Sequence, residues 1–352
     1  MVLAFYGYLG ISIATLSTLG LMLGVYAFRL KPTRSRLQRD LKRLASVIPL
    51  GEFLQKDYAA PSVVQYYAST TFRDYKLLAL ATGSIAMHSL LKPARSMPYR
   101  CGHLKQLLYV VAQMGDAVHG GKVLEVGFGK GANSIFLADL FPNANFLGID
   151  VVEEHVSYAN DYGSTRGLTN VAFTLDDAST PSAKTMAEGP FDLIFGVESF
   201  CHLDSEEKLT GFLRFARQCL KPNGRLVIVD GYRSASFENE PEEVQHAMML
   251  AESGFRIRAM PSKPSWQLMA STARLTLVDD VDLTPEALAF WTQGWKVAHV
   301  LLLLLPWAVR AYVASSLKHA ETGANFVSVA TTAYAMALGS AVYGVLVFKN
   351  GS

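Results

Sequence analysis

The sequence lacks the signals of several protein classes. Its three cysteines, Cys101, Cys201 and Cys219, form no Cys-x-x-Cys pair, which argues against a disulfide scaffold or a structural zinc site and fits a reducing compartment. Metal-ligand spacings, a Gly-x-Ser-x-Gly elbow and a Walker loop are all missing. The 32 basic and 30 acidic residues leave a net charge of +2, with no basic face of the kind that binds nucleic acid. We therefore expect no metal and no nucleic-acid partner, and the oligomeric state stays open.

Charge is also missing from the start of the chain. Met1–Phe28 is uncharged and exceeds the roughly 20 residues that a helix needs to cross a bilayer. A basic flank follows, with Asp40 as its one acid: Arg29, Lys31, Arg34, Arg36, Arg39, Lys42 and Arg43. This pattern predicts a single-pass transmembrane anchor over 1–28 and a basic juxtamembrane linker over 29–60, with the catalytic domain cytoplasmic. A cleaved signal peptide carries its charges before the apolar stretch, so the alternative is a buried N-terminal helix of a soluble domain.

Residues 61–348 are predicted to form one α/β domain. A helical lead-in over 61–120 is interrupted by prolines, and short strand-like runs then alternate with helical stretches. The expected strands are Lys122–Val126, Asn145–Asp150, Val171–Leu175, Phe191–Val197 and Arg225–Asp230. Such βαβ units build a parallel sheet and confine ligands to the carboxyl ends of its strands.

The C-terminal third contains two long apolar stretches. Val297–Val309 is only about half a membrane thickness long and contains Pro306, so we expect a core or interfacial helix within an insertion over 232–338. Gly323–Phe348 is uncharged, but Gly339-Ser340 divides it. We expect a helix followed by a final strand, Ala341–Phe348, and a second membrane span is the alternative.

The strongest motif is the glycine-rich turn that follows the first predicted strand. Glu125 lies in the strand, and Gly127, Gly129 and Gly131 make the turn into the next helix. Glycines let the backbone turn sharply and let a ligand approach where a Cβ would clash. The turn also satisfies the dinucleotide-binding pattern, so the glycines alone leave the ligand open.

Carboxylates near the ends of three successive strands separate the candidate ligands. Glu125 beside the turn would repel a pyrophosphate but can hold the ammonium group of a methionine moiety. Asp150, which precedes Val151, can accept hydrogen bonds from two ribose hydroxyls, and Asp177 can accept one from the exocyclic amine of an adenine. Each acid alone could be a solvated loop charge, but three at successive strand ends favour a cofactor site.

These residues resemble the successive motifs of class I S-adenosylmethionine-dependent methyltransferases, as do Phe191–Ile194 and Leu220–Arg225. More narrowly, they are similar to the branch that holds the tocopherol, sterol and ubiquinone methyltransferases and the cyclopropane fatty-acid synthases. The resemblance covers about residues 60 to 348. It implies a Rossmann-like α/β fold, a mostly parallel seven-stranded sheet with an antiparallel last strand, and S-adenosyl-L-methionine as cofactor. The cofactor-binding positions that it implies are Glu125, Gly127, Gly129, Gly131, Asp150, Val151 and Asp177, with Tyr67 or Tyr66 over the cofactor unless they are plain core aromatics.

The segment after the fourth strand carries the candidate catalytic residues. Glu198 and His202 resemble the Glu…His pair found there in sterol, cyclopropane and certain N-methylating enzymes. Methyl transfer requires the enzyme to align the acceptor and to remove its proton, and residues four apart can face one pocket. Glu198 could also stabilise a developing carbocation, whereas His202 could instead cap a helix or pack in the core. Asp230 could line the acceptor site or pair with Arg233.

The sequence therefore predicts an S-adenosylmethionine-dependent methyltransferase that acts on a hydrophobic or lipid-like acceptor at a membrane. Carbon methylation is favoured by the pair Glu198 and His202. Alternatives are an N- or O-methyltransferase of a soluble small molecule, a NAD(P)-dependent oxidoreductase, and a non-catalytic adaptor. An adaptor is expected to lose the glycines and carboxylates that this chain retains.

Overall fold

The computed structural model describes residues 30–54, 60–69, 84–91, 102–317 and 322–351. Its centre is one sheet built from Lys122–Val126 (β1), Asn145–Asp150 (β2), Val171–Leu175 (β3), Phe191–Val197 (β4), Leu220–Arg233 (β5), Leu275–Asp282 (β6) and Ala341–Asn350 (β7). The seven strands have the order β3-β2-β1-β4-β5-β7-β6. The first five pair in parallel, and β7 lies antiparallel between β5 and β6. This confirms the predicted sheet and its antiparallel last strand.

Helices cover both faces of the sheet. Alternate side chains of β5 point to opposite sides, so that Val227 and Val229 belong to one apolar core and Leu226 and Ile228 to another. The helices over the first core include Gly102–Met114 (α6) and Ala132–Leu140 (α7), and those over the second include Glu206–Cys219 (α10) and Lys263–Thr272 (α12). Glu153–Thr165 (α8) and Ala183–Glu188 (α9) complete this half, with 3-10 turns at Gly115–His119, Phe200–His202 (η3) and Phe237–Asn239.

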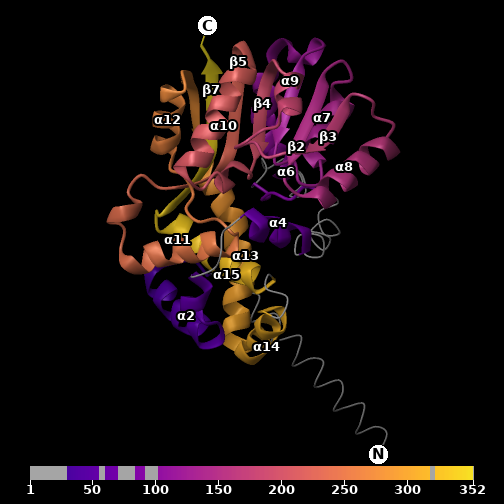
Figure 1. Ribbon diagram of the computed structural model, residues 1–352. Helices are drawn as coiled ribbons and strands as arrows, with labels where there is room; N and C mark the ends of the chain where they lie inside the picture. The colour runs from indigo at the N-terminus through magenta and orange to yellow at the C-terminus, as the bar shows by residue number, and fades with distance from the viewer. Residues whose placement is uncertain (1–29, 55–59, 70–83, 92–101, 318–321, 352) are drawn as a thin grey trace, which may run out of the picture.

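A second group of helices lies below the carboxyl edge of the parallel strands (Figure 1). It consists of Arg34–Val47 (α2), Leu50–Leu54 (α3), Ala60–Ser69 (α4), Glu242–Gly254 (α11), Thr284–Leu304 (α13), Pro306–Leu317 (α14) and Thr322–Ala337 (α15). α15 packs against both α11 and α13, and α2 packs across α11, α13 and α14. The chain thus places helices from both of its ends over the edge of the sheet where ligands bind.

The structure corrects the expected linker over 29–60. Leu37 and Leu44, two turns apart on α2, are buried, as Asp40 is between them. The Asp40 carboxylate lies 2.6 Å from Nδ1 of His299 on α13 and accepts a 2.7 Å hydrogen bond from the Tyr334 hydroxyl on α15. The segment is therefore a packed element. The predicted anchor over 1–28 lies outside the described residues and stays a prediction.

The C-terminal third confirms the helix-then-strand expectation, because α15 is followed by β7, and a second span over 323–348 is wrong. The apolar stretch Val297–Val309 is divided between α13 and α14 at Pro306, whose ring cannot continue a helix. Within the described ranges, α13 alone is long and apolar enough to cross a membrane. Sequence analysis missed β6, an acidic strand with mostly exposed side chains, inside the expected insertion.

Candidate active site

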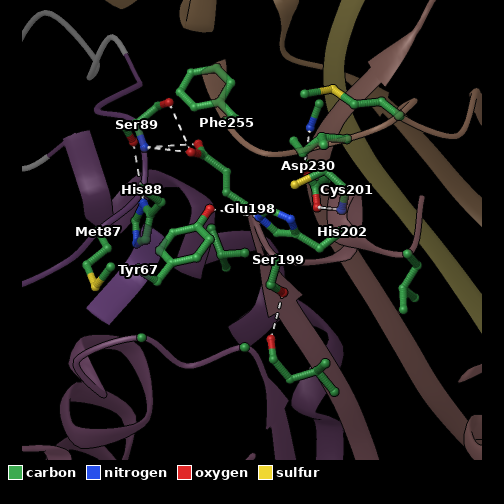
Figure 2. Close-up of a pocket in the computed structure, with 18 of the residues that line it drawn as sticks. Tyr67, Met87, His88, Ser89, Glu198, Ser199, Cys201, His202, Asp230 and Phe255 are labelled. Carbon is green, nitrogen blue, oxygen red and sulfur yellow. Dashed lines mark hydrogen bonds between the residues drawn. The ribbon is translucent and has the colours of Figure 1, made fainter. Parts of the chain in front are cut away.

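A cavity of about 450 Å³ lies between the carboxyl edge of the sheet and the lower helices. The glycine turn and the ends of β1, β2, β4 and β5 line it on one side. The helices α11, α13 and α15 supply an apolar wall on the other side, which includes Met248, Phe255, Phe290, Trp291, Val329 and Met336. Figure 2 shows the part of the cavity where the two sides meet.

The turn between β1 and α7 requires its glycines. Gly127, Gly129 and Gly131 have φ values of +67°, +55° and +77°, in the left-handed region that side chains disfavour. A Cβ at Gly127 would lie 2.4 Å from Cβ of Ser199, and one at Gly129 would lie 2.9 Å from Sδ of Met87. Gly127 and Gly129 line the cavity, whereas Gly131 precedes α7 and lies outside the lining.

Asp150 connects the glycine turn to the end of β2. Its carboxylate accepts hydrogen bonds from the N–H groups of Gly129 at 2.8 Å and Val152 at 3.0 Å. Val151 and Asp177 line the same part of the cavity. Asp177 is held in its loop because one of its oxygens accepts hydrogen bonds from the backbone and hydroxyl of Ser179. The structure thus brings together most of the predicted cofactor residues.

Glu125 lies beneath the turn and outside the cavity lining. It is 1% exposed and accepts hydrogen bonds from Nδ2 of Asn133 at 2.9 Å and from the Ser134 backbone N–H at 3.1 Å. Burial raises the pKa of Glu125 to about 7, although these hydrogen bonds lower it. The described geometry gives Glu125 the task of tying the turn to α7, and its contact with a cofactor ammonium stays a prediction.

The glycine turn and its acids fit S-adenosylmethionine. A backbone turn free of Cβ atoms, with Asp150 at the next strand end and Asp177 after the third, supplies a close approach for an amino-acid moiety and two carboxylates for hydroxyl or amine donors. The remainder of the cavity is lined mostly by apolar side chains, with Glu198, His202 and Asp230 among them. Both parts belong to one continuous space, as a methyl donor and its acceptor require.

Glu198 lines this space and follows β4 directly. Its carboxylate accepts hydrogen bonds from the Ser89 backbone N–H at 3.0 Å and the Ser89 hydroxyl at 3.1 Å (Figure 2). It accepts a third from the Tyr343 hydroxyl at 2.8 Å. Its φ of +52° is unusual for a side-chain-bearing residue and costs on the order of 1 kcal/mol. The structure thus fixes the Glu198 carboxylate beside the apolar part of the cavity, and its catalytic role stays a prediction.

Both residues that donate to Glu198 were missed by sequence analysis. Ser89 lies in the stretch 84–91, which was expected to be mostly helical and forms neither helix nor strand. Tyr343 comes from β7, which pairs with the end of β5. Gln106 of α6 donates 2.7 Å and 3.3 Å hydrogen bonds to the Ser89 carbonyl and the Tyr343 hydroxyl, and so holds both in place. Because Ser89 and Tyr343 lie 109 and 145 residues from Glu198, no local motif could connect them.

His202 lines the cavity from η3, and its Nε2 lies 2.7 Å from the Tyr67 hydroxyl. Burial lowers the pKa of His202 to about 4, so the imidazole is neutral near pH 7 and is a weak proton acceptor. The geometry favours a role in orienting Tyr67 over the cavity, while a direct catalytic role of His202 stays a prediction. Tyr66 is buried and hydrogen-bonded to Asn325 on α15.

Asp230 lies on β5, three residues before the strand ends at Arg233, and beside Glu198. It is 2% exposed, lines the cavity and accepts hydrogen bonds from the N–H groups of Gly231 at 2.7 Å and Cys201 at 2.9 Å. Burial, and after it the charge of Glu198, raises the pKa of Asp230 to about 7. The alternative pairing with Arg233 is wrong, because that guanidinium forms a two-point ion pair with Glu252 at 2.7 and 2.6 Å.

Residues 117–273 match the protein family described as "Methyltransferase domain". Among curated relatives, the erythromycin 3''-O-methyltransferase of Saccharopolyspora erythraea is 29% identical over 126 residues, which are 36% of this chain and 40% of that protein. The fatty-acid O-methyltransferase of Mycolicibacterium smegmatis is 30% identical over 125 residues, 36% of this chain and 42% of that protein. The matched segment thus spans less than half of either relative.

Solved structures show the same fold over most of the chain. A mycolic acid cyclopropane synthase complexed with SAH and CTAB aligns with a TM-score of 0.65 at 13% identity, covering 83% of this chain and 100% of the other. The geranyl diphosphate C-methyltransferase of Streptomyces coelicolor, solved with Mg2+, geranyl diphosphate and S-adenosyl-L-homocysteine, aligns with a TM-score of 0.61 at 15% identity, covering 84% and 100%.

Proposed function

We propose that the protein transfers a methyl group to a small hydrophobic acceptor, and that carbon is the atom methylated. The premise is that residues 117–273 form a methyltransferase domain with the class I S-adenosylmethionine-dependent fold. S-adenosylmethionine is the cofactor. The observation that carries the proposal is the single cavity, which joins the glycine turn and Asp150 to an apolar chamber with Glu198 between them. The closing strand β7, antiparallel beside β5, disfavours the oxidoreductase alternative.

The cofactor end of the cavity is assigned from its polar groups. Gly127 and Gly129 form the turn beside the amino-acid moiety, Asp150 accepts hydrogen bonds from the ribose hydroxyls, and Asp177 accepts one from the adenine amine. Tyr67, held by His202, covers the cofactor from α4. Glu125 supports this end from below through Asn133 and Ser134 of α7.

The acceptor end is assigned from its apolar lining. Phe255, Trp291, Val329 and Met336 leave few polar partners, so an acceptor with several exposed polar groups would lose hydrogen bonds to water without replacement. Apolar substituents gain free energy in the same place. The chamber therefore suits a prenyl, steroid-like or acyl compound. Two structural neighbours, the geranyl diphosphate C-methyltransferase and the mycolic acid cyclopropane synthase, support this class of acceptor.

Glu198 is the residue that we assign to the acceptor's proton. Bound S-adenosylmethionine supplies an electrophilic methyl group on a sulfonium. When the acceptor carbon has taken that methyl group, Glu198 stabilises the positive charge that develops on the acceptor and accepts the proton that leaves it. Ser89 and Tyr343 keep the carboxylate in place, since their N–H and O–H groups donate to it from two sides.

Oxygen methylation is the second candidate. The two curated relatives described above are O-methyltransferases. Asp230, whose buried carboxyl has a pKa of about 7, is suited to accept the proton of a hydroxyl near neutral pH. The position of the label in the product distinguishes the two candidates, because an O-methyl group is cleaved by hydrogen iodide and a C-methyl group is not.

The test uses the full chain in detergent, S-adenosylmethionine labelled in its methyl group, and a total lipid extract. Label in an organic-soluble product is expected with the native chain and absent with Glu125→Ala, which removes support from the glycine turn. Glu198→Gln should bind the cofactor but form little product. Cofactor binding with label only in water-soluble acceptors would exclude the hydrophobic acceptor, and a native chain that fails to bind S-adenosylmethionine would exclude the methyltransferase.

Attachment to a membrane through residues 1–28 is part of the proposal. The uncharged run ends at Phe28, the described chain begins at Leu30, and α2 with its basic residues follows. An acceptor that dissolves in lipid would then be concentrated beside the helices that wall the cavity.

A further inference from the structure

Among the described residues, a group of exposed apolar side chains lies at the end of the molecule opposite the C-terminus of the chain (Figure 1). It is formed by the end of α13 and the beginning of α14, and we name it the α13–α14 patch. Its exposed members are Val297 at 61%, Leu303 at 37%, Leu304 at 45%, Leu305 at 40% and Trp307 at 71%. Large apolar side chains are common singly on a protein surface, but five in one short segment mark a surface that contacts something apolar.

The patch belongs to the unburied face of α13. Val297 and Leu304 are seven residues apart, which puts them on one side of the helix. The opposite side buries Trp295, His299 and Leu302 against α2 and α15. Because the earlier residues Phe290 and Trp291 line the cavity, the same helix connects the active site to the patch.

Helix α2, which packs against both α13 and α14, carries basic side chains. Arg39 and Lys42 are exposed and lie on the same side of α2 as Ser46, one turn further on. The Ser46 carbonyl accepts a hydrogen bond from Arg310 of α14, which joins this side of α2 to the patch. The acidic residue of α2, Asp40, is buried, and residues 294–317 include no aspartate or glutamate. An apolar patch next to a basic helix is complementary to a lipid surface that carries negative charge.

We propose that the α13–α14 patch docks on the surface of an anionic bilayer, with Trp307 and the leucines in the headgroup and upper acyl region and the α2 cations on the phosphates. Tryptophan is enriched at this depth, and each basic residue near an anionic surface adds about 1 kcal/mol. α13 then lies along the bilayer surface, because its other face is buried against α2 and α15. The docked surface opens a route from lipid to the cavity along α13.

This inference does not depend on turnover, and so it can fail separately from the proposed function. The full chain is reconstituted into vesicles of phosphatidylcholine, alone or with phosphatidylglycerol, whose acyl chains are brominated. Bromine quenches tryptophan fluorescence at short range. The chain has four tryptophans, of which Trp266 and Trp295 are each 1% exposed, so the signal of Trp307 is obtained as the difference between the native chain and Trp307→Leu.

We expect brominated anionic vesicles to quench this difference signal by roughly half or more, and brominated neutral vesicles to quench it less. Leu304→Glu should abolish the quenching of Trp307, whereas Leu268→Glu should not, because Leu268 is 70% exposed on α12, away from the patch. Arg39→Glu with Lys42→Glu should reduce quenching only in anionic vesicles. Lys184→Glu, an exposed cation on α9, is the matched control.

Two results would overturn the proposal. In the first, the chain floats with the vesicles but bromine leaves the Trp307 signal unchanged, so that the patch stays away from the lipid. In the second, the native chain is a dimer in detergent and Trp307→Glu makes it a monomer, so that a second copy covers the patch. Unchanged binding of S-adenosylmethionine by each variant shows that it has folded.

Discussion

The two ends of the cavity are built in different ways. The cofactor end comes from β1 to β3 and the loops that follow them, between Lys122 and Ser179. The acceptor end collects side chains from the stretch 84–91, β4, β5, α11, α13, α15 and β7. A binding site made from one short stretch of chain can be recognised as a motif. A site made from segments hundreds of residues apart is formed by folding and leaves no local pattern.

The two ends also differ electrostatically. At the cofactor end, Asp150 and Asp177 accept hydrogen bonds from backbone N–H groups in loops. At the acceptor end, Glu198 and Asp230 are close enough that the charge of one raises the pKa of the other. We therefore expect the carboxylates of the cofactor end to act in cofactor binding and those of the acceptor end to act in proton transfer. Substitutions at the two ends should therefore affect cofactor affinity and kcat separately.

Glu198→Gln should have the largest effect, and this effect should be on kcat and not on cofactor binding. Removing a proton acceptor typically costs about 100-fold to 10,000-fold in rate, so we expect kcat with the lipid extract to fall by at least about 100-fold. Binding of S-adenosylmethionine, measured by calorimetry, should change by less than about threefold, because Asp150 and the glycine turn are untouched. A variant that keeps its kcat would remove Glu198 from the chemistry.

Asp150→Ala should have the converse effect. It removes the acceptor for the N–H groups of Gly129 and Val152 as well as the carboxylate for the ribose, so we expect cofactor affinity to fall by about 100-fold or more. Asp139→Ala is the matched control, since Asp139 is exposed and pairs only with Arg166 at the surface. Equal affinities for the two variants in calorimetry would contradict the assignment of the cofactor end.

Tyr343→Phe should have a smaller effect on the rate. The change removes one 2.8 Å hydrogen bond to Glu198 and keeps the ring, so we expect kcat to fall by about 10-fold, as for the loss of one hydrogen bond to a charged group. Tyr109→Phe on α6, outside the cavity lining, should leave kcat unchanged. If only KM for the acceptor rose, Tyr343 would act in binding rather than in positioning Glu198.

Asp230→Asn should have the smallest effect, and it concerns stability. The raised pKa means that the folded state binds the Asp230 proton more tightly than the unfolded state does, so this contribution to stability is lost as pH rises from about 4 to about 7. The variant lacks this loss, and its melting temperature relative to the native chain should therefore rise between pH 5 and pH 8. At 1.36 kcal/mol per pH unit, the difference is at most about 3 kcal/mol.

The control for this experiment is Asp139→Asn, whose melting curve should run parallel to that of the native chain at every pH. Parallel curves for Asp230→Asn as well would show that Asp230 is not a buried, proton-binding carboxyl. In that case Asp230 would also be a poor proton acceptor for an oxygen substrate, and the second candidate function would lose its base.

Sequence alone determined most of the central sheet and most of the cofactor end. The glycine turn needs left-handed backbone at Gly127 and Gly129, and a carboxylate must follow the next strand at Asp150, so both leave fixed spacings. The final strand β7 was likewise readable, because Gly339 and Ser340 interrupt an otherwise continuous apolar run, and the resemblance to class I methyltransferases implied its antiparallel orientation. These features depend on interactions between residues that are close in sequence.

The tertiary structure decided the acceptor end. It brings Ser89 and Tyr343 within hydrogen-bond distance of Glu198. It pairs Arg233 with Glu252 rather than with Asp230, and it buries Glu125 beneath the glycine turn. It also made α2 a packed helix rather than a linker. None of these follows from spacing, because a buried carboxylate takes whichever donors the fold brings to it, and those donors lie on elements whose order in space differs from their order in the chain.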